Sequence, residues 1–307
     1  GAGHAYAGQD VQLVVVAVPP DHLGEQIARV LRETDAVVTD VGSIKSQPLE
    51  QLRSLAPDLV GRYVGSHPMA GSERSGPLAG SATLFEGRPW AITAHETAEP
   101  EAVALVEELV RNCGGVPLRL TPAEHDAAVA RTSHLPHLMS SLTAGRLADA
   151  PSEHLQLSGQ GVRDVTRIAA GDPHLWQQII GANSPALVTL LDEVRERIDE
   201  LRTLLVDGRR EELGDLLAEG VRGTEAIPGK HGGPARPMRS VFVAVPDNPG
   251  ELARLFADAG RTEVNIEDIR IDHDPGRPVG LVELIVDAER GYYLVTSLTA
   301  RGWDVRE

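Results

Sequence analysis

Side chains of the kinds that carry acid–base and ion-binding chemistry gather in four short segments of the chain. A histidine can take up a proton near neutral pH, and an arginine can hold a carboxylate through two parallel hydrogen bonds. The segments are TDVGSIKS with Ser43, GSHPMAGSERSG with His67, Ser72 and Glu73, SHLPH with Ser133, His134 and His137, and GVRDVTRIAAGDPHLW with Asp164, Thr166, Arg167, Asp172 and Trp176.

Taken singly, each of these residues has an ordinary structural explanation. His67 precedes a proline and could be a turn histidine, and Arg167 could form a surface ion pair. Asp164 and Asp172 are typical of helix caps, Asp172 the more so because a proline follows it. Trp176 is most simply a core residue.

A metal site is one alternative for the histidine pair. His134 and His137 stand three residues apart on an expected helix, so one of them could be a metal ligand. No carboxylate stands at a matching spacing, and we therefore expect no metal ion here.

Two apolar strands are expected to position the first of these segments. VQLVVVAV ends at Val18 before Pro19 and Pro20, and AVVTDVGS ends at Ser43. Continuous β-branched runs indicate strands buried on both faces, as in a parallel sheet. Because α/β proteins bind nucleotides at the carboxyl ends of such strands, both turns are candidate cofactor-binding sites, although many parallel sheets bind nothing there.

Strand and helix alternate over residues 1–120. An amphipathic helix is expected over 23–31, the strands RYVGSHP and PWAITA follow, and a second helix is expected over 100–111. This alternation indicates an α/β domain with a parallel sheet.

The pattern becomes helical from Thr121 to about residue 226. Thr121, Pro122 and Glu124 make a good helix start, with a capping residue, a proline and an acid. One long helix carries a leucine-rich face that could pack against another subunit or equally within the chain. That face is formed by Leu187, Leu190, Leu191, Val194, Ile198, Leu201, Leu204 and Leu205.

Residues 227–237 (IPGKHGGPARP) have the composition of a linker, with glycines, prolines and no apolar periodicity. Residues 238–307 then read as strand, helix, two strands, helix and strand. This order predicts a split βαβ sandwich that forms a complete small domain.

Composition excludes some classes of partner. The formal net charge is -16, which argues against nucleic acid as the main partner because phosphate binding needs clustered Lys and Arg. The single cysteine, Cys113, permits no intrachain disulfide. No apolar run is long enough to span a bilayer, and the first ten residues do not look like a signal peptide. We expect a cytoplasmic protein without a membrane partner.

Together, the four segments resemble the prephenate/arogenate dehydrogenases of tyrosine biosynthesis, from residue 11 to about residue 221. SHLPH and DVTRIAAGDP are specific, and their order and separation agree with the family. The C-terminal part is similar to an ACT domain, an amino-acid-sensing module. The resemblance implies an N-terminally incomplete Rossmann-type sheet, an all-helical dimerisation domain and a βαββαβ ACT-like regulatory domain.

The resemblance also implies a reaction and its machinery. In such enzymes prephenate loses CO2 as the C4 hydride passes to NAD, which gives 4-hydroxyphenylpyruvate. His67 matches the base that accepts the C4 hydroxyl proton, and Ser43 matches a serine that hydrogen-bonds this histidine near the nicotinamide. Cofactor contacts are expected at Val18, Pro19 and Pro20 as well.

Substrate-binding roles follow from the same resemblance. Arg167 matches the arginine that holds the ring carboxylate, and His137 matches the residue that contacts the pyruvyl side chain. Ser72 and Glu73 match a pair at the pocket entrance.

Feedback regulation by tyrosine or phenylalanine is implied by the ACT-like domain, often across a homodimer. The expected effector-binding residues are Asp247, Asn248, Gly250, Asn265 and Ile266. The alternative is a degenerate domain that only dimerises.

Family members begin with a strand, a glycine-rich turn, a helix and a second strand, which we do not find before residue 11. Gly1 to Gly8 looks like a dinucleotide fingerprint, but no strand precedes it and Tyr6 replaces the third glycine. We interpret it as the tail of a missing segment. If the chain were complete, NAD binding should be weakened; NADP is not excluded, because the discriminating acid would lie in that segment.

Three alternatives stay open. Arogenate dehydrogenase differs only in the amino group of the substrate side chain, and His137 slightly favours prephenate. A β-hydroxyacid dehydrogenase would need a lysine-based motif where SHLPH stands. A truncated, non-catalytic amino-acid-binding protein is disfavoured by the joint presence of four residues, Ser43, His67, His137 and Arg167.

Overall fold

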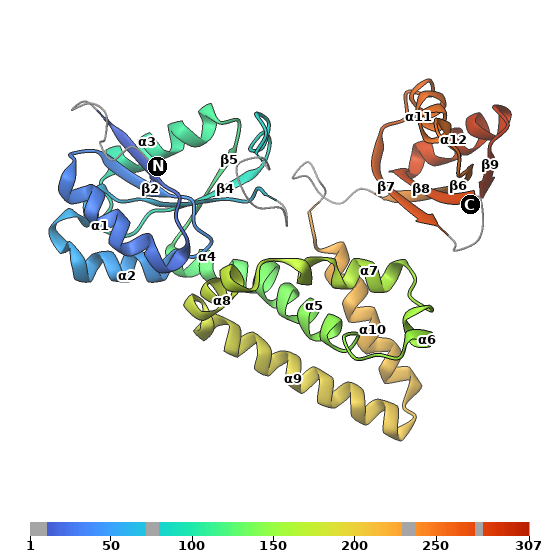
Figure 1. Ribbon diagram of the computed structural model, residues 1–307, viewed down its shortest axis with the longest axis horizontal. Helices are drawn as coiled ribbons and strands as arrows, with labels where there is room; N and C mark the ends of the chain where they lie inside the picture. Colours follow the sequence, from blue (N-terminus) through green and yellow to red (C-terminus); the bar gives the residue numbers. More distant parts are fainter. Residues whose placement is uncertain (1–10, 72–79, 229–236, 274–278, 307) are drawn as a thin grey trace. The chain divides into compact units, whose positions relative to one another are not determined.

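The structure is a computed structural model that describes residues 11–71, 80–228, 237–273 and 279–306. The chain divides into two compact units, Gly1–Val206 and Asp207–Glu307 (Figure 1). Each unit has its own core.

The first unit opens with a β–α–β arrangement, as predicted. Strands β1 (Leu13–Val16) and β2 (Val37–Asp40) pair in parallel, and helix α1 (Leu23–Glu33) connects them after a short 3-10 turn, Pro20–His22. Among the described residues β1 has a strand partner on one side only, and Val15 is 43% exposed. The prediction that this strand is buried on both faces is therefore wrong.

The remaining strands depart from a fully parallel sheet. After helix α2 (Ser46–Leu55) and a 3-10 segment (Pro57–Arg62), a parallel bridge between Val38 and Tyr63 leads into β3 (Gly65–Pro68). Strand β4 (Pro89–Thr93) pairs antiparallel with β3. Antiparallel neighbours can be joined without the helical crossover that parallel neighbours need. The sheet is mixed.

A fifth strand, β5 (Val116–Leu120), pairs in parallel with β4 after helix α3 (Pro100–Asn112). The sequence reading missed it because the segment VPLRL is short and its side chains are mostly exposed or half-buried. The two faces of the sheet have separate cores. Helices α1 and α2 cover one face and α3 covers the other (Figure 1).

The helical part of the first unit begins at the predicted cap. Helix α4 (Pro122–Val129) starts with a capping box between Thr121 and Glu124. A π-helical turn, Ala130–His134, leads directly into α5 (Leu135–Gly145). The elements that follow are α6 (Ser152–Leu155), α7 (Gln160–Thr166), a 3-10 turn (Arg167–Ala170), α8 (Pro173–Ala182) and α9 (Ser184–Asp207).

Asp172 caps α8 as predicted, because its side chain accepts a hydrogen bond from the His174 N–H at 3.0 Å. Asp164 does not cap a helix. It lies inside α7 and accepts from the Gln160 amide at 2.8 Å, so that prediction was wrong.

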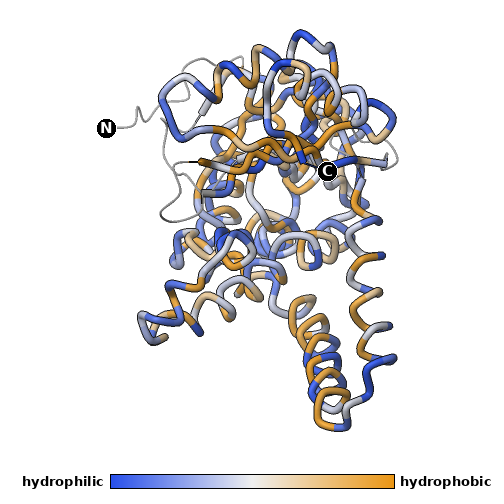
Figure 2. The backbone as a smooth tube through the Cα atoms, turned by 90° about the vertical axis from the view of Figure 1, so that its right-hand side faces the viewer, coloured by the Kyte–Doolittle hydropathy of each residue, from blue (hydrophilic) through white to orange (hydrophobic). Residues whose placement is uncertain are grey.

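Hydrophobic and hydrophilic residues alternate along the long helices (Figure 2). On α9, Leu187 and Leu204 are buried while Ile198 is 56% exposed, so the leucine-rich face is only partly covered within this chain.

The second unit contains α10 (Arg210–Glu225) and a four-stranded sheet with two further helices. The elements are β6 (Met238–Pro246), α11 (Glu251–Gly260), β7 (Ile266–His273), β8 (Val279–Asp287), α12 (Ala288–Ala300) and β9 (Asp304–Arg306). The strand order is β7-β8-β6-β9, and all neighbours are antiparallel. This is the predicted split βαβ arrangement. Within the described residues, no helix is long and apolar enough to cross a membrane.

Candidate active site

One cavity of about 570 Å³ in the first unit is lined by residues from all four segments singled out by sequence. Ser43 follows β2, His67 lies on β3, and Arg167 begins the 3-10 turn before α8. Of the described residues that line the cavity, Arg167 alone carries a permanent charge. The full lining is Ser43, His67, Pro68, Met69, Ala70, Gly71, Ser133, His134, Arg167, Ile168, Gly171, Leu175, Trp176 and Ile179.

His67 is fixed by another histidine. Its Nδ1 lies 2.9 Å from Nε2 of His125 on α4, and the two rings meet edge to face with centroids 5.1 Å apart. Burial, followed by the charge of Lys45, holds the pKa of His67 well below its usual value. His67 is therefore a neutral base at neutral pH. Among the described residues no hydrogen bond joins Ser43 to His67, although both line the cavity.

Asp126 continues the row of side chains behind His67. Its Oδ1 lies 2.8 Å from Nδ1 of His125, and its carboxylate accepts the backbone N–H groups of Lys45 and Ser46 at 2.9 and 2.8 Å. Burial raises the pKa of Asp126, but the hydrogen bonds from His125 and Ser46 outweigh it and the pKa lies below its usual value. Asp126 thus stays a carboxylate.

A buried ion pair shapes the loop that carries Ser43. Nζ of Lys45 contacts Oδ2 of Asp40, and both side chains are fully buried. The Lys45 ammonium also donates to the carbonyl of Ser66 at 2.8 Å, next to His67. Asp40 accepts further hydrogen bonds from the Tyr63 hydroxyl and the Gly42 N–H, both at 2.9 Å. The loop after β2 and the strand of His67 are therefore bound to the same charged pair.

His134 and His137 have different surroundings. His134 lines the cavity, and its Nδ1 lies 3.1 Å from the Asn183 amide nitrogen. Burial lowers the pKa of His134 to about 4. His137 is not among the lining residues. Its ring stacks on Trp176 with centroids 3.6 Å apart and an interplanar angle of 9°.

Trp176 is a wall of the cavity and not the core residue expected from sequence. Gly171 lies against it so closely that a Cβ there would stand 2.5 Å from Nε1 of Trp176. Nδ1 of His137 is buried and has no hydrogen-bond partner among the described residues. Cε1 of His137 would lie 3.4 Å from a Cβ on Gly171, so this ring stands at the edge of the cavity.

Two family models match consecutive parts of the chain. The nucleotide-binding domain of prephenate dehydrogenase matches residues 3–118, and its dimerization domain matches residues 121–219. The chain belongs to the prephenate dehydrogenase family.

Similar proteins agree with this membership. "Probable prephenate dehydrogenase NovF" of Streptomyces niveus is 34% identical, over 99% of this chain and 87% of that protein. Prephenate dehydrogenase of Bacillus subtilis (strain 168) is 27% identical, over 86% and 72%.

Solved structures of the family match the fold. Prephenate dehydrogenase from Aquifex aeolicus in complex with hydroxyphenyl propionate and NAD+ superposes with a TM-score of 0.64 at 28% identity, over 70% of this chain and 77% of that one. Arogenate dehydrogenase of Synechocystis gives 0.62 at 28%, over 70% and 80%.

The turn after β1 is where a prephenate dehydrogenase family member is expected to hold its nicotinamide cofactor. The register of β1 on β2 brings Val18, Pro19 and Pro20 to the same sheet edge as Ser43, since parallel strands end together. Gly42 packs directly against Leu23, because a Cβ there would meet that side chain at 2.5 Å.

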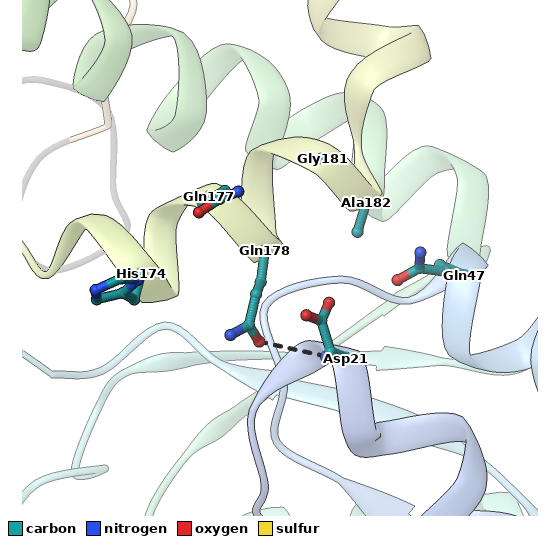
Figure 3. Close-up of a pocket in the computed structure, with 7 residues that line it drawn as sticks. All are labelled: Asp21, Gln47, His174, Gln177, Gln178, Gly181 and Ala182. Atoms are coloured by element: carbon teal, nitrogen blue, oxygen red, sulfur yellow. Dashed lines mark hydrogen bonds between the residues drawn. The ribbon is translucent and has the colours of Figure 1, made fainter.

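A second cavity, of about 270 Å³, lies on another face of α8. Figure 3 shows the Gln178 side chain reaching from α8 toward Asp21, whose N–H donates to Oε1 of Gln178 at 3.4 Å. Gln47 completes one wall. This contact ties the helical segment to the turn that follows β1.

Other predicted site residues fall elsewhere. Ser72 and Glu73 lie outside the described residues. In the second unit, the turn at Asp247, Asn248 and Gly250 follows the end of β6 that pairs with Val279, whereas Asn265 and Ile266 lie beside Val286 at the other end of β8. The two groups are about 24 Å apart by the rise of a strand, so one protomer does not bring them together.

His125, Asp126, Lys45 and Asp40 were missed by the sequence reading. The available signals were weak: a His-Asp pair just after a helix cap, and a lysine two residues beyond Ser43. No group of three His, Cys, Asp or Glu side chains within the described ranges is arranged to hold a metal ion.

Proposed function

We propose that this protein catalyses the NAD-dependent oxidative decarboxylation of prephenate to 4-hydroxyphenylpyruvate, a step of tyrosine biosynthesis. The observation that carries the proposal is the shared cavity of about 570 Å³ in which neutral His67 and cationic Arg167 both line the wall. A base and an anion-binding group in one cavity are what the reaction of a dicarboxylate with a C4 hydroxyl group requires.

His67 acts as the base. Its Nδ1 is held by His125, so Nε2 on the other side of the ring takes the C4 hydroxyl proton. NAD, when bound, supplies the acceptor for the C4 hydride. Loss of CO2 then leaves the electron pair on the C4 oxygen, and the protonated His67 returns the proton to it. The reaction consumes no net proton, and a positioned base of this kind contributes about 10²- to 10⁴-fold to the rate.

Arg167 holds a carboxylate of the substrate, because a planar guanidinium can make two parallel hydrogen bonds to it. Trp176 and His134 supply the wall beside the substrate side chain. His137, which stacks on Trp176, contacts the pyruvyl side chain and so slightly favours prephenate. Arogenate is therefore the second candidate substrate, as in the Synechocystis relative named for it.

The cofactor occupies the sheet edge at Val18, Pro19, Pro20 and Ser43. These residues lie where two parallel strands end. NAD is the cofactor named for the Aquifex relative.

We further propose the domain limits 1–120, 121–226, 227–237 and 238–307, with the last as an ACT-like regulatory domain. The strand order of its sheet supports this assignment. Because Asp247 to Gly250 and Asn265 to Ile266 lie at opposite ends of β8, tyrosine or phenylalanine would bind between two copies. The exposed part of the α9 apolar face supports a homodimer through the helical domain.

The test is a rate assay with NAD or NADP and either prephenate or arogenate, repeated with tyrosine and with phenylalanine. We expect turnover with NAD and prephenate, and a His67→Asn variant that loses at least about 10²-fold in kcat while KM changes little. A nearly unchanged kcat in His67→Asn would refute the base. No turnover with any combination would refute the function.

A further inference from the structure

We propose that His125 and Asp126 form a proton relay with His67, which selects the nitrogen of His67 that acts as base and stabilises the proton it receives. The proposal deepens the proposed function and rests on it for the identity of the base. The three side chains come from different elements, His67 from β3 and the other two from α4, with contacts of 2.9 and 2.8 Å between them.

The direction of the relay follows from what each atom can donate. The Asp126 carboxylate can only accept, so Nδ1 of His125 must donate to it. Nε2 of a neutral His125 then has a lone pair, and the hydrogen in the contact with His67 belongs to Nδ1 of His67. The lone pair of His67 is thereby fixed on Nε2. This is the atom that faces away from His125.

Asp126 is held rigidly enough to set this direction. It is 5% exposed, and it accepts the N–H groups of Lys45 and Ser46 where helix α2 begins. The N-terminal end of a helix stabilises a carboxylate. Its own backbone carbonyl accepts from the Asn183 amide at 2.8 Å, which binds α4 to the end of α8.

The relay changes where the proton resides during the reaction. The O–H bond of the substrate breaks and an N–H bond forms at Nε2 of His67. The Nδ1–H bond of His67 can then break as an N–H bond forms at Nε2 of His125, which places the positive charge beside the Asp126 carboxylate. When CO2 has left, the two transfers reverse and the proton returns to the substrate oxygen. Burial and, after it, the charge of Lys45 lower the pKa of His67, so moving the positive charge to His125 beside Asp126 relieves that cost.

The first test needs no turnover. Long-range proton–nitrogen NMR of the imidazole rings in the full chain at neutral pH reads which nitrogen of each histidine carries hydrogen. We expect His67 with hydrogen on Nδ1 and a bare Nε2, and the same tautomer for His125. The signals are assigned by their loss in His67→Asn and His125→Gln. Hydrogen on Nε2 of His67, or a doubly protonated His125, would overturn the relay.

The second test separates two roles of His125: orienting the His67 ring and accepting a proton from it. His125→Gln keeps an acceptor for Nδ1–H of His67 but cannot take up a proton, whereas His125→Phe removes the acceptor as well. We expect kcat to fall about tenfold in the first and about 10²-fold in the second, with KM within about threefold of wild type.

His95→Gln is the matched control, because His95 is also a buried histidine of the first unit, bonded to the Tyr63 carbonyl at 3.0 Å. Its kcat should equal that of wild type. A folded His125→Phe protein with unchanged kcat would also overturn the relay, and if that variant fails to fold, His125→Gln and the NMR result still decide. Wild-type protein that shows the expected tautomers without turnover would refute the proposed reaction and leave the tautomer assignment standing.

Discussion

Adding one methyl group at Gly171 should disturb the cavity more than any distant change of similar size. The backbone there has φ -63° and ψ 157°, which alanine adopts without strain. The methyl carbon would, however, stand 2.5 Å from Nε1 and 3.0 Å from Cδ1 of Trp176, and 3.4 Å from Cε1 of His137. The effect of Gly171→Ala is therefore purely one of space.

The size of the effect follows from these contacts. Trp176 must move by about 1 Å to restore an ordinary contact, and a close-packed site does not absorb such a shift freely. Its other contacts are the stack on His137, with centroids 3.6 Å apart, and the edge of His134. Overpacking of this kind costs about 1–3 kcal/mol of stability, and a displacement of about 1 Å in a catalytic site can cost about 10²-fold in rate.

Steady-state kinetics with prephenate and calorimetry of the same preparation measure both effects. We expect kcat/KM to fall about 10- to 10²-fold and the melting temperature of the first unit to fall by several degrees, about 2–4 °C per kcal/mol. Gly161→Ala is the control, because nothing lies within 4 Å of its added Cβ and it sits in α7. It should be as active as wild type and slightly more stable. A Gly171→Ala enzyme within twofold of wild type in kcat/KM and equal in stability would refute the reasoning.

The remaining predictions concern charged groups of the first unit. Arg167→Gln should raise KM for prephenate about 10- to 10²-fold, the value of a charged hydrogen bond, with a smaller change in kcat; unchanged KM in steady-state kinetics would remove the carboxylate role. Lys45→Met should destabilise the unit by about 3–5 kcal/mol, because it leaves the buried Asp40 carboxylate without its cation. In the double variant with Asp40→Asn, calorimetry should show that part of this stability is restored. The pKa of His134 is about 4 in the folded state and near 6.5 in the unfolded state. Between pH 4 and pH 6.5 the unfolded state therefore binds a proton at this residue and the folded state does not. The free energy of unfolding should therefore fall as pH drops from 6.5 toward 4. The fall should be somewhat less than about 1.4 kcal/mol per pH unit, because solvent in the cavity screens the charge. In His134→Gln the urea-denaturation midpoint should depend less on pH in this range.

Local signals in the sequence were sufficient for several elements. Thr121 and Glu124 form the capping box that their spacing predicts, and Asp172 caps α8 because a proline follows it. The order of strands and helices expected for residues 238–307 is also observed, and β6 and β8 alternate buried with half-buried or exposed residues. In each case the residues that decide the local structure lie within or next to the element that they form.

Strand direction and the second half of the site depend on contacts between distant residues. Strand β4 runs antiparallel to β3, and the two short strand sequences do not specify that direction. His67 and His125 are 58 residues apart, and Lys45 and Asp126 are 81 apart. A His-Asp pair in the second turn of a helix is most often on the surface. Only the packing of α4 against the loop after β2 buries it and makes its carboxylate part of the site.

The helix that carries SHLPH contains one local irregularity, immediately before α5. Pro136 has no N–H, and in a continuous α-helix its ring would collide with the carbonyl of Thr132. The chain relieves this conflict with the π-helical turn Ala130–His134 immediately before α5. An extra residue in a turn rotates every side chain before it relative to those after it. His134 and His137 both follow the start of this turn and keep the three-residue spacing that puts two side chains on one helix face. Both therefore contact the Trp176 ring, His134 edge-on and His137 by stacking, and His134 also lines the cavity.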